Sequence, residues 1–257
     1  MTVLHRIGDQ VRHRLGIHLG PHKEYLLAAR LEKLQREEGY PDLEQFYAAL
    51  ESGDPRAVDA LARHLTTNHT FFFREPEHFP LLVKLLQAAG VRRPRIWSAA
   101  GSTGEEGYSL AITLAEAGFS DSVVLVSDVN HDVLVRAQRG VYDPSRMEKV
   151  PPGLVARYFE PWEGSQYRIR SHLRSRLRFR CVNLIDALDV AEPPDVIFCR
   201  NLLIYFDPEG VRLVLTRLID ALKPGGWLFL GQTEGFHRPP GPVRQIHSSV
   251  FQKTVAP

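Results

Sequence analysis

Hydrophobic residues recur at helical spacing through the first part of the chain, and no strand pattern competes with them there. The first long predicted helix covers residues 22–39 and carries leucines at helical intervals: Leu26, Leu27, Leu31 and Leu34. Two further amphipathic helices begin after Asp42, a typical N-cap residue, and at Pro55, a typical first-turn residue. This pattern predicts an N-terminal all-α domain over residues 1–75.

Beyond residue 76 the pattern alternates between amphipathic helices and apolar runs of strand length. We predict strands at residues 96–99, 123–127, 194–201 and 227–231, and helices at residues 79–90, 108–117, 132–139 and 208–222. Apolar strands that alternate with helices are typical of a parallel sheet covered on both faces. The final segment, 244–255, predicts an antiparallel closing strand. Residues 76–257 should therefore form a doubly wound α/β domain.

A segment at residues 151–180 interrupts this alternation, because its hydrophobic pattern has period two. Its apolar members are Ile169, Leu173, Leu177 and Phe179, and its basic members are Arg168, Arg170, Arg174, Arg176, Arg178 and Arg180. This predicts an inserted β-subdomain of short antiparallel strands with one apolar and one basic face, appended to the main sheet.

Composition fits an ordinary folded protein, since 44% of the 257 residues are hydrophobic. No apolar run approaches the roughly 20 residues of a membrane helix, and the N-terminus lacks the apolar stretch of a signal peptide. We therefore expect a cytoplasmic protein without membrane insertion. Cys181 and Cys199 predict two buried thiols, with neither a disulfide framework nor a metal site. The formal charge is only +2, so an acidic partner would have to meet local basic patches.

The segment RIWSAAGSTGEEGYSL at residues 95–110 predicts a strand, a glycine turn and the start of a helix. Gly101, Gly104 and Gly107 would let the backbone approach a nucleotide-like ligand, and free N–H groups at the helix start would face it. Their spacing, G-x-x-G-x-x-G, does not match the dinucleotide fingerprint G-x-G-x-x-G. By itself the segment leaves an ordinary strand-to-helix turn open.

Acidic residues near this turn are candidate ligand contacts. Asp128 ends the next predicted strand, where a carboxylate can accept both ribose hydroxyls of a nucleoside, although it could instead cap the following helix. Glu105 and Glu106 lie at a helix start, where negative charge is favourable for structural reasons alone. A ligand with an ammonium group would make one of them a natural partner.

Polar residues also follow the later strands. Asn183 comes after the basic segment, and Arg200, Asn201 and Tyr205 come at and after the strand at 194–201. Because the carboxyl ends of parallel strands meet at one edge of a sheet, these residues can converge beside the glycine turn. Asn183 could contact an adenine edge. Tyr205 could face a substrate or be a packed core aromatic.

Arg74 follows three phenylalanines at the junction of the two predicted domains. A guanidinium held among aromatic side chains suits bidentate binding of a carboxylate. The alternative is a surface ion pair with Glu75 or Glu77.

Several ordered segments together resemble the CheR family of chemoreceptor glutamate methyltransferases, which use S-adenosylmethionine. The matching segments run from about residue 22 to near the end of the chain: LTTNHTFFFRE, WSAAGSTGEEGYSLAITLA, SDVNHDVLVRAQRGVY, VNL, IFCRNLLIYF and LKPGGWLFLGQTEGF. TTNHTFFFRE and IFCRNLLIYF are highly specific in combination. The resemblance implies a Rossmann-like methyltransferase with a mostly parallel, seven-stranded sheet.

The resemblance also implies roles for individual residues. The cofactor contacts would be Asn68, Thr70, Arg74, Gly101, Glu106, Asp128, Asn183, Leu184, Arg200 and Asn201. Arg74 would lie near the transferred methyl group and Tyr205 would face the substrate, so these two are the candidate catalytic residues. The products would be glutamyl methyl esters on chemotaxis receptors and S-adenosylhomocysteine, formed without a metal.

The implied partner is the cytoplasmic helical domain of a chemoreceptor, and we expect a monomeric enzyme. Arg30, Lys33 and Arg36 occupy positions that are basic in the family, where this helix face meets receptor helices; a merely solvated face is the alternative, because nearby glutamates dilute the charge. The inserted strands resemble a subdomain that grips a tethering peptide in some members. Its loop EPWEGSQ is shorter here than in those members, which predicts methylation without a pentapeptide tether.

Three other functions compete with this one. A nucleic-acid methyltransferase could place the arginine-rich segment along a phosphate backbone, but enzymes that methylate base amines carry an Asn/Asp-Pro-Pro-aromatic motif where this chain has CRNLLIY. A nicotinamide-dependent oxidoreductase would need a different glycine spacing. A non-catalytic receptor-binding module would not need Arg74, Asp128 and Tyr205. We therefore expect an enzyme with no nucleic-acid partner.

Overall fold

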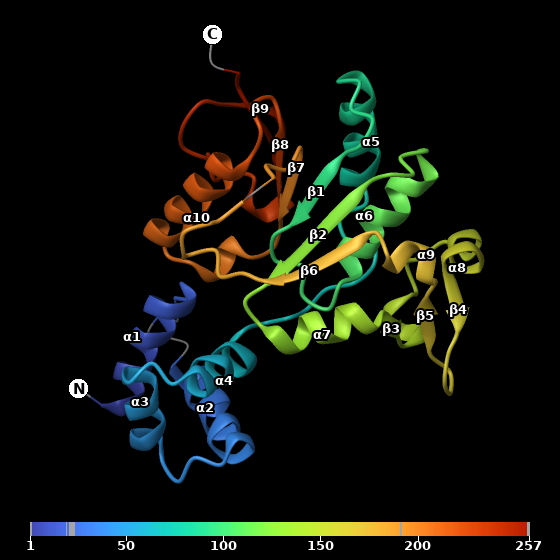
Figure 1. Cartoon of the computed structure of the whole chain (residues 1–257). Helices are drawn as coiled ribbons and strands as arrows, with labels where there is room; N and C mark the ends of the chain where they lie inside the picture. Colours follow the sequence, from blue (N-terminus) through green and yellow to red (C-terminus); the bar gives the residue numbers. More distant parts are fainter. Residues whose placement is uncertain (1, 19, 21–23, 191, 256–257) are drawn as a thin grey trace.

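A computed structural model describes residues 2–18, 20, 24–190 and 192–255. Its N-terminal part consists of α1 (Val3–Leu15), α2 (Glu24–Glu38), α3 (Leu43–Glu51) and α4 (Pro55–Leu65), which gather at one end of the sheet (Figure 1). The predicted helix starts are confirmed, because the Asp42 side chain accepts the Gln45 N–H and Pro55 lies in the first turn of α4. Residues 22 and 23, the first two of the helix predicted over 22–39, lie outside the described part of the chain.

The helical domain has its own apolar core and is joined closely to the rest of the chain. Each helix turns one apolar stripe inward, with Ile7, Leu31, Phe46 and Leu61 fully buried. Gly16 ends α1 at φ 72°, where a Cβ would lie 2.8 Å from the Ile185 side chain and would overlap the ring of Phe206. The next residues continue this junction, since the His18 N–H donates to the Tyr205 carbonyl at 2.7 Å. The end of α1 is therefore packed against the segment that carries Tyr205.

The larger part of the molecule is built on a seven-stranded sheet of order β6-β2-β1-β7-β8-β10-β9. Its strands are β1 (Arg95–Ser98), β2 (Val123–Asp128), β6 (Leu177–Cys181), β7 (Val196–Cys199), β8 (Trp227–Leu230), β9 (Val243–His247) and β10 (Val250–Lys253). The first five strands in the order are parallel, and β10 runs antiparallel to β8 and β9. This confirms the predicted mostly parallel, doubly wound sheet. The predicted single closing strand is instead a hairpin of β9 and β10.

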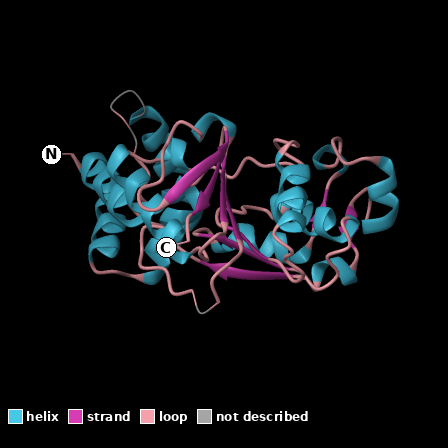
Figure 2. Cartoon of the chain, turned by 90° about the horizontal axis from the view of Figure 1, so that it is seen from above, coloured by secondary structure: helices cyan, strands magenta, loops and turns pink. Residues whose placement is uncertain are grey.

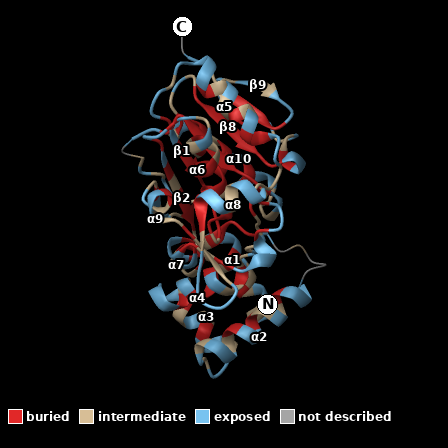
Figure 3. Ribbon diagram, turned by 90° about the vertical axis from the view of Figure 1, so that its right-hand side faces the viewer, coloured by how far each residue is buried: buried red, intermediate tan, exposed pale blue. Residues whose placement is uncertain are grey.

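Helices lie on both sides of the strands (Figure 2), and alternating side chains of the strands pack against these two layers. On one face, Ile96 and Phe198 pack with α5 (His78–Ala88), α6 (Glu105–Glu116) and α7 (His131–Arg139). On the other, Trp97 and Ile197 pack with α10 (Pro208–Ala221). Burial on both faces explains why the strands are continuous apolar runs in the sequence, and the buried residues follow the sheet in Figure 3.

The period-two prediction for the inserted segment is only partly right. A small antiparallel sheet of order β3-β5-β4 does exist, formed by β3 (Val141–Tyr142), β4 (Phe159–Pro161) and β5 (Tyr167–Ile169), together with α8 (Pro152–Tyr158) and α9 (Ser171–Arg174). Leu173, however, lies in α9, and β6 pairs in parallel with β2 as an edge strand of the large sheet. Alternation shows only that a strand is half exposed, and it carries no information about its neighbour.

The two cysteines differ in burial. Both cysteines are free, and Cys199 is buried as expected, but Cys181 is exposed. Among the described residues, none of the helices combines the length and the apolar character needed to cross a membrane.

Candidate functional site

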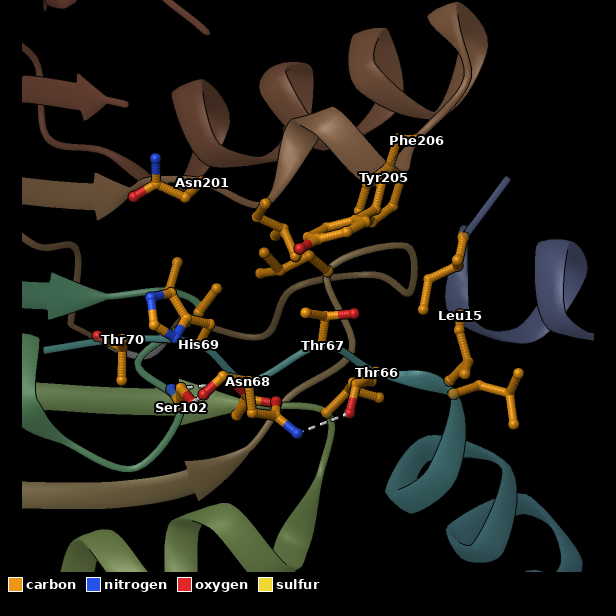
Figure 4. Close-up of a pocket in the computed structure, with 18 of the residues that line it drawn as sticks. Leu15, Thr66, Thr67, Asn68, His69, Thr70, Ser102, Asn201, Tyr205 and Phe206 are labelled. Atoms are coloured by element: carbon orange, nitrogen blue, oxygen red, sulfur yellow. Dashed lines mark hydrogen bonds between the residues drawn. The ribbon is translucent and has the colours of Figure 1, made fainter. Parts of the chain in front are cut away.

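A cavity of about 360 Å³ lies between the helical domain and the carboxyl ends of β1, β2, β6 and β7. This volume falls within the range of about 300–1,000 Å³ that is usual for small-molecule sites. Its wall includes these residues predicted from the sequence: Arg30, Asn68, Thr70, Arg74, Glu106, Asp128, Asn183, Leu184, Arg200, Asn201 and Tyr205. Figure 4 shows Asn201 and Tyr205 on one side of the space and the linker from Thr66 to Thr70 on the other.

The glycine turn after β1 is held tightly against β2. A Cβ on Gly101 would overlap the Val126 side chain, and one on Gly104, which has φ 95°, would lie 2.8 Å from the Ala137 Cβ. Gly101 is therefore needed for close packing, while the cavity wall itself is formed by its neighbours Ala100 and Ser102. Glycine at these positions keeps the turn close to the sheet, whereas a larger residue would push the backbone away from it.

Asp128 presents a carboxylate at the end of β2 and is 9% exposed. Each of its oxygens accepts one backbone N–H at 3.0 Å, from Ser102 and from Asn130. Burial raises the pKa of this carboxyl group, which the two backbone N–H donors oppose. The alternative role as a helix cap is wrong, because Asn130 is the N-cap of α7.

Arg200 fixes three elements of the wall to one another. Its guanidinium, 1% exposed, donates from Nε to a Glu106 oxygen at 2.7 Å and from Nη1 to the Arg74 carbonyl at 2.8 Å. The other Glu106 oxygen accepts from the Ser98 hydroxyl at 2.7 Å. Arg200 thus supports the cavity wall: it follows β7 and its hydrogen bonds connect this strand end to Glu106 in α6 and to the backbone of Arg74.

His78 lies behind this ion pair and is fully packed. Its Nδ1 is 3.1 Å from Nη1 of Arg200, which can only donate, so Nε2 carries the hydrogen and donates to the Ser249 hydroxyl at 2.9 Å. Burial and the Arg200 charge lower the pKa of His78 to about 4. Nearby, Glu75 accepts from the Asn201 side chain at 3.1 Å. The helical pattern of α5 gave no signal for this buried polar network, because its partners are far away in the sequence.

Arg74 lies on the cavity wall at the junction of the two domains. Its guanidinium donates to the His69 carbonyl at 3.1 Å and lies 5.7 Å from the centre of the Phe71 ring. The predicted alternative, a surface pair with Glu75 or Glu77, is not what the structure shows. Glu75 faces Arg200 at 3.5 Å, and the Glu77 carboxylate accepts a hydrogen bond from the Gln232 side chain. The guanidinium of Arg74 can therefore receive a carboxylate.

Tyr205 closes the opposite side of the space. It ends the short helical turn η3 (Leu203–Tyr205), and its phenol points into the cavity in Figure 4. Tyr205 also packs against the core of the helical domain, so it both lines the cavity and contributes to packing.

The helical domain contributes to the cavity in a way that the sequence did not indicate. Arg30 donates to the Leu65 carbonyl at 2.6 Å and to the Thr67 hydroxyl at 2.8 Å, which ties it to the start of the linker. Arg30 is thus part of the cavity wall, whereas Lys33 and Arg36 are exposed on α2. The side chain of Asn183 also crosses to this domain and donates to the Arg14 carbonyl at 2.7 Å.

Arg146 connects the inserted subdomain to the linker. From the turn η2 (Pro144–Arg146), it donates to the Thr70 carbonyl at 2.7 Å and to Glu105 at 3.2 Å. Glu105 is 1% exposed and burial raises its pKa. Of the two neighbouring glutamates, Glu105 therefore stabilises the fold and Glu106 lines the cavity.

Two family models match successive parts of the chain. The family model described as the CheR methyltransferase all-alpha domain matches residues 3–66, and the CheR methyltransferase SAM binding domain matches residues 68–251. The chain belongs to the CheR methyltransferase family. It is similar to a chemotaxis protein methyltransferase of Salmonella typhimurium, at 40% identity over 90% of this chain and 83% of that protein. A second CheR relative, chemotaxis protein methyltransferase 2 of Pseudomonas aeruginosa, is 40% identical over 95% of this chain and 91% of its own length.

Proposed function

We propose that this CheR protein transfers a methyl group from S-adenosylmethionine to glutamate side chains of methyl-accepting chemotaxis receptors, giving glutamyl methyl esters and S-adenosylhomocysteine. Relatives that share about 40% of its residues are named chemotaxis protein methyltransferases. The observation that most supports the proposal is the placement of Arg74, from the segment that follows the N-terminal helices, and Asp128, at the end of β2, on the wall of one cavity.

The residues around this cavity suit S-adenosylmethionine chemically. Asp128 would accept the ribose hydroxyls, and Glu106 would pair with the ammonium group, while Asn68, Thr70 and Asn201 supply polar groups on the same wall. Because the side-chain amide of Asn183 is already bonded to Arg14, we assign adenine contacts to the backbone of Asn183 and to the buried Leu184. Once bound, the cofactor supplies an electrophilic methyl group on a sulfonium.

The protein's part in the reaction is mainly to position a carboxylate. A glutamate side chain has an ordinary pKa of about 4.3, so it is ionised at neutral pH and needs no general base. Arg74 would hold its negative charge, and the Tyr205 phenol would donate a hydrogen bond from the other side of the cavity. Holding reacting groups about 3 Å apart and in line supplies much of the rate enhancement in such a reaction.

The receptor's helical cytoplasmic domain is the proposed partner of a monomeric, cytoplasmic enzyme. Lys33 and Arg36 on the exposed face of α2 offer positive charge to acidic receptor helices. We further propose that the short loop between β4 and β5 does not grip a pentapeptide tether. Calorimetry with such a receptor-tail peptide should show no specific binding, and tight binding with one-to-one stoichiometry would contradict this.

Methyl labelling tests the proposed activity. The enzyme is incubated with cofactor labelled in its methyl group and with receptor cytoplasmic fragments, and the product is then treated with base. A carboxyl ester releases labelled methanol under these conditions, whereas methylated amines do not. Base-stable label on the receptor, or label on nucleic acid alone, would contradict the proposal.

A further inference from the structure

Glu234 is a buried carboxylate beneath the segment that carries Tyr205. It lies in the short turn η4 (Gln232–Glu234) after β8 and is 0% exposed. One oxygen accepts the Leu203 N–H at 2.7 Å, and the other accepts the N–H groups of Asn201 at 2.7 Å and Gly231 at 2.9 Å. A single side chain therefore accepts hydrogen bonds from Asn201 and Leu203, in the segment that leads to Tyr205, and from Gly231 at the end of β8.

The backbone that Glu234 holds is unusual. Asn201 has φ 57°, a left-handed conformation that residues other than glycine rarely adopt. Its N–H bonds to Glu234, while its side chain donates to Glu75 at 3.1 Å, so it is held from two sides. Two residues later the η3 turn begins at Leu203, whose N–H has no partner within so short a helix and bonds to Glu234 instead.

Gly231 shows how closely this carboxylate is packed. A Cβ at this position would lie 2.7 Å from Oε2 of Glu234 and 2.9 Å from the Asn201 side-chain nitrogen. Any larger residue at position 231 would therefore displace either the carboxylate or Asn201. Geometry of this kind is expected where a neighbouring side chain must be placed accurately.

We propose that Glu234 is a positioning residue for methyl transfer, which acts by fixing the turn from Asn201 to Tyr205 and so aims the Tyr205 phenol into the cavity. The inference rests on the proposed function, because it assigns the purpose of this support to Tyr205. Glu234 contacts no substrate and acts only through the backbone.

The variant Glu234→Gln tests this with little change in size. Glutamine keeps one acceptor oxygen but replaces the other with an NH2 group, which would face N–H donors of the turn. We expect kcat to fall about 10- to 100-fold and KM for S-adenosylmethionine to rise by a smaller factor, because Asn201 is one of several residues on the cofactor wall. Asp195→Asn is the matched control: Asp195 is another buried carboxylate that accepts a backbone N–H, from Arg95 at 2.8 Å, at the opposite ends of the strands. Its kcat should stay within about twofold of the wild-type value.

A double-mutant cycle with Tyr205→Phe separates positioning from a general loss of stability. If Glu234 acts through Tyr205, the Tyr205→Phe substitution should cost much less in the Glu234→Gln background than in the wild type. Effects that simply multiply, or a Glu234→Gln enzyme with wild-type kcat, would overturn the proposal. If Glu234→Gln does not fold, Gly231→Ala replaces it in the same cycle with the same expected and contradicting outcomes, because its methyl group would press on both the Glu234 carboxylate and Asn201 and so disturb their contact without removing either residue.

A measurement on the protein without cofactor or receptor keeps this inference distinct from the proposed function. In fluorotyrosine-labelled protein, the fluorine resonance of Tyr205, assigned with Tyr205→Phe, should shift and broaden in Glu234→Gln, while that of the buried Tyr108 should not change. An unchanged Tyr205 resonance would overturn the positioning role. Absence of methyl transfer by the wild-type protein would instead contradict the proposed function and leave this spectral result to stand by itself.

Discussion

Replacing His78 with glutamine should remove a pH-dependent part of the free energy of unfolding. Burial and the neighbouring Arg200 charge lower the pKa of His78 from 6.5 to about 4. As the pH falls, the unfolded chain takes up a proton on this ring near its ordinary pKa of about 6.5, whereas the folded protein keeps the ring neutral until about pH 4. The stability that depends on the neutral ring is therefore fully present above that ordinary pKa and is lost as the pH falls toward the folded value.

The size of this effect follows from the two pKa values. A shift of this size corresponds to about 3 kcal/mol once both states are protonated, of which about 2 kcal/mol is lost between about pH 7.5 and about pH 5. Burial raises the pKa of Glu105, Asp128 and Glu234, so these groups increase the free energy of unfolding as the pH falls, opposite to the effect of His78. These carboxyl groups are present in both proteins, so the difference between wild type and His78→Gln isolates the histidine.

Urea unfolding measures the difference, with the buried Trp97 as a fluorescent reporter. Glutamine can still accept a hydrogen bond from Arg200 but does not titrate, so the wild type should lose about 2 kcal/mol more than the variant between the two pH values. Equal losses in the two proteins would show that folding does not lower the pKa of His78, and would refute the claim that burial and Arg200 keep its ring neutral down to about pH 4.

Three further substitutions test other parts of the account. Arg74→Ala should lower methyl transfer by about two orders of magnitude with an unchanged melting temperature, as expected for a lost contact to the reacting group, and near-normal turnover would refute that role. Gly104→Ala should destabilise the fold by about 1–3 kcal/mol in urea unfolding, because its Cβ would press on Ala137 at a left-handed φ, and unchanged stability would show that the turn can relax. Arg146→Ala should raise KM for S-adenosylmethionine more than it lowers kcat, because the Thr70 carbonyl loses its donor, whereas the exposed Arg157→Ala should behave as wild type. Equal kinetics of these two variants would show that the Arg146 contact to the linker does not affect cofactor binding.

The order of elements could be predicted from the sequence because each has a strong local signal. The apolar runs of β1, β2 and β7 are buried on both faces, and Asp42 and Pro55 start helices through local hydrogen bonds and a fixed φ. Strand neighbours have no such signal. Thus β6 was expected in the insertion, although it pairs with β2 in the large sheet.

The site shows the same division between local and distant information. Asp128 and the glycine turn were predictable because both follow strands of the sheet, at the edge where ligands bind. The support behind them was not, since Arg200 reaches the carbonyl of Arg74 and the ring of His78 across more than a hundred residues of sequence. Arg30 was expected on a docking face. Its bond to the Leu65 carbonyl could not be predicted from the sequence, because that bond depends on how α2 and α4 pack.

The most direct test of the central claim is a crystal structure of the protein with S-adenosylhomocysteine. The ribose hydroxyls should bond to Asp128, and the sulfur should lie between Arg74 and Tyr205, with an open path for a carboxylate. A nucleoside bound outside this cavity, or a sulfur remote from the Arg74 guanidinium, would contradict it.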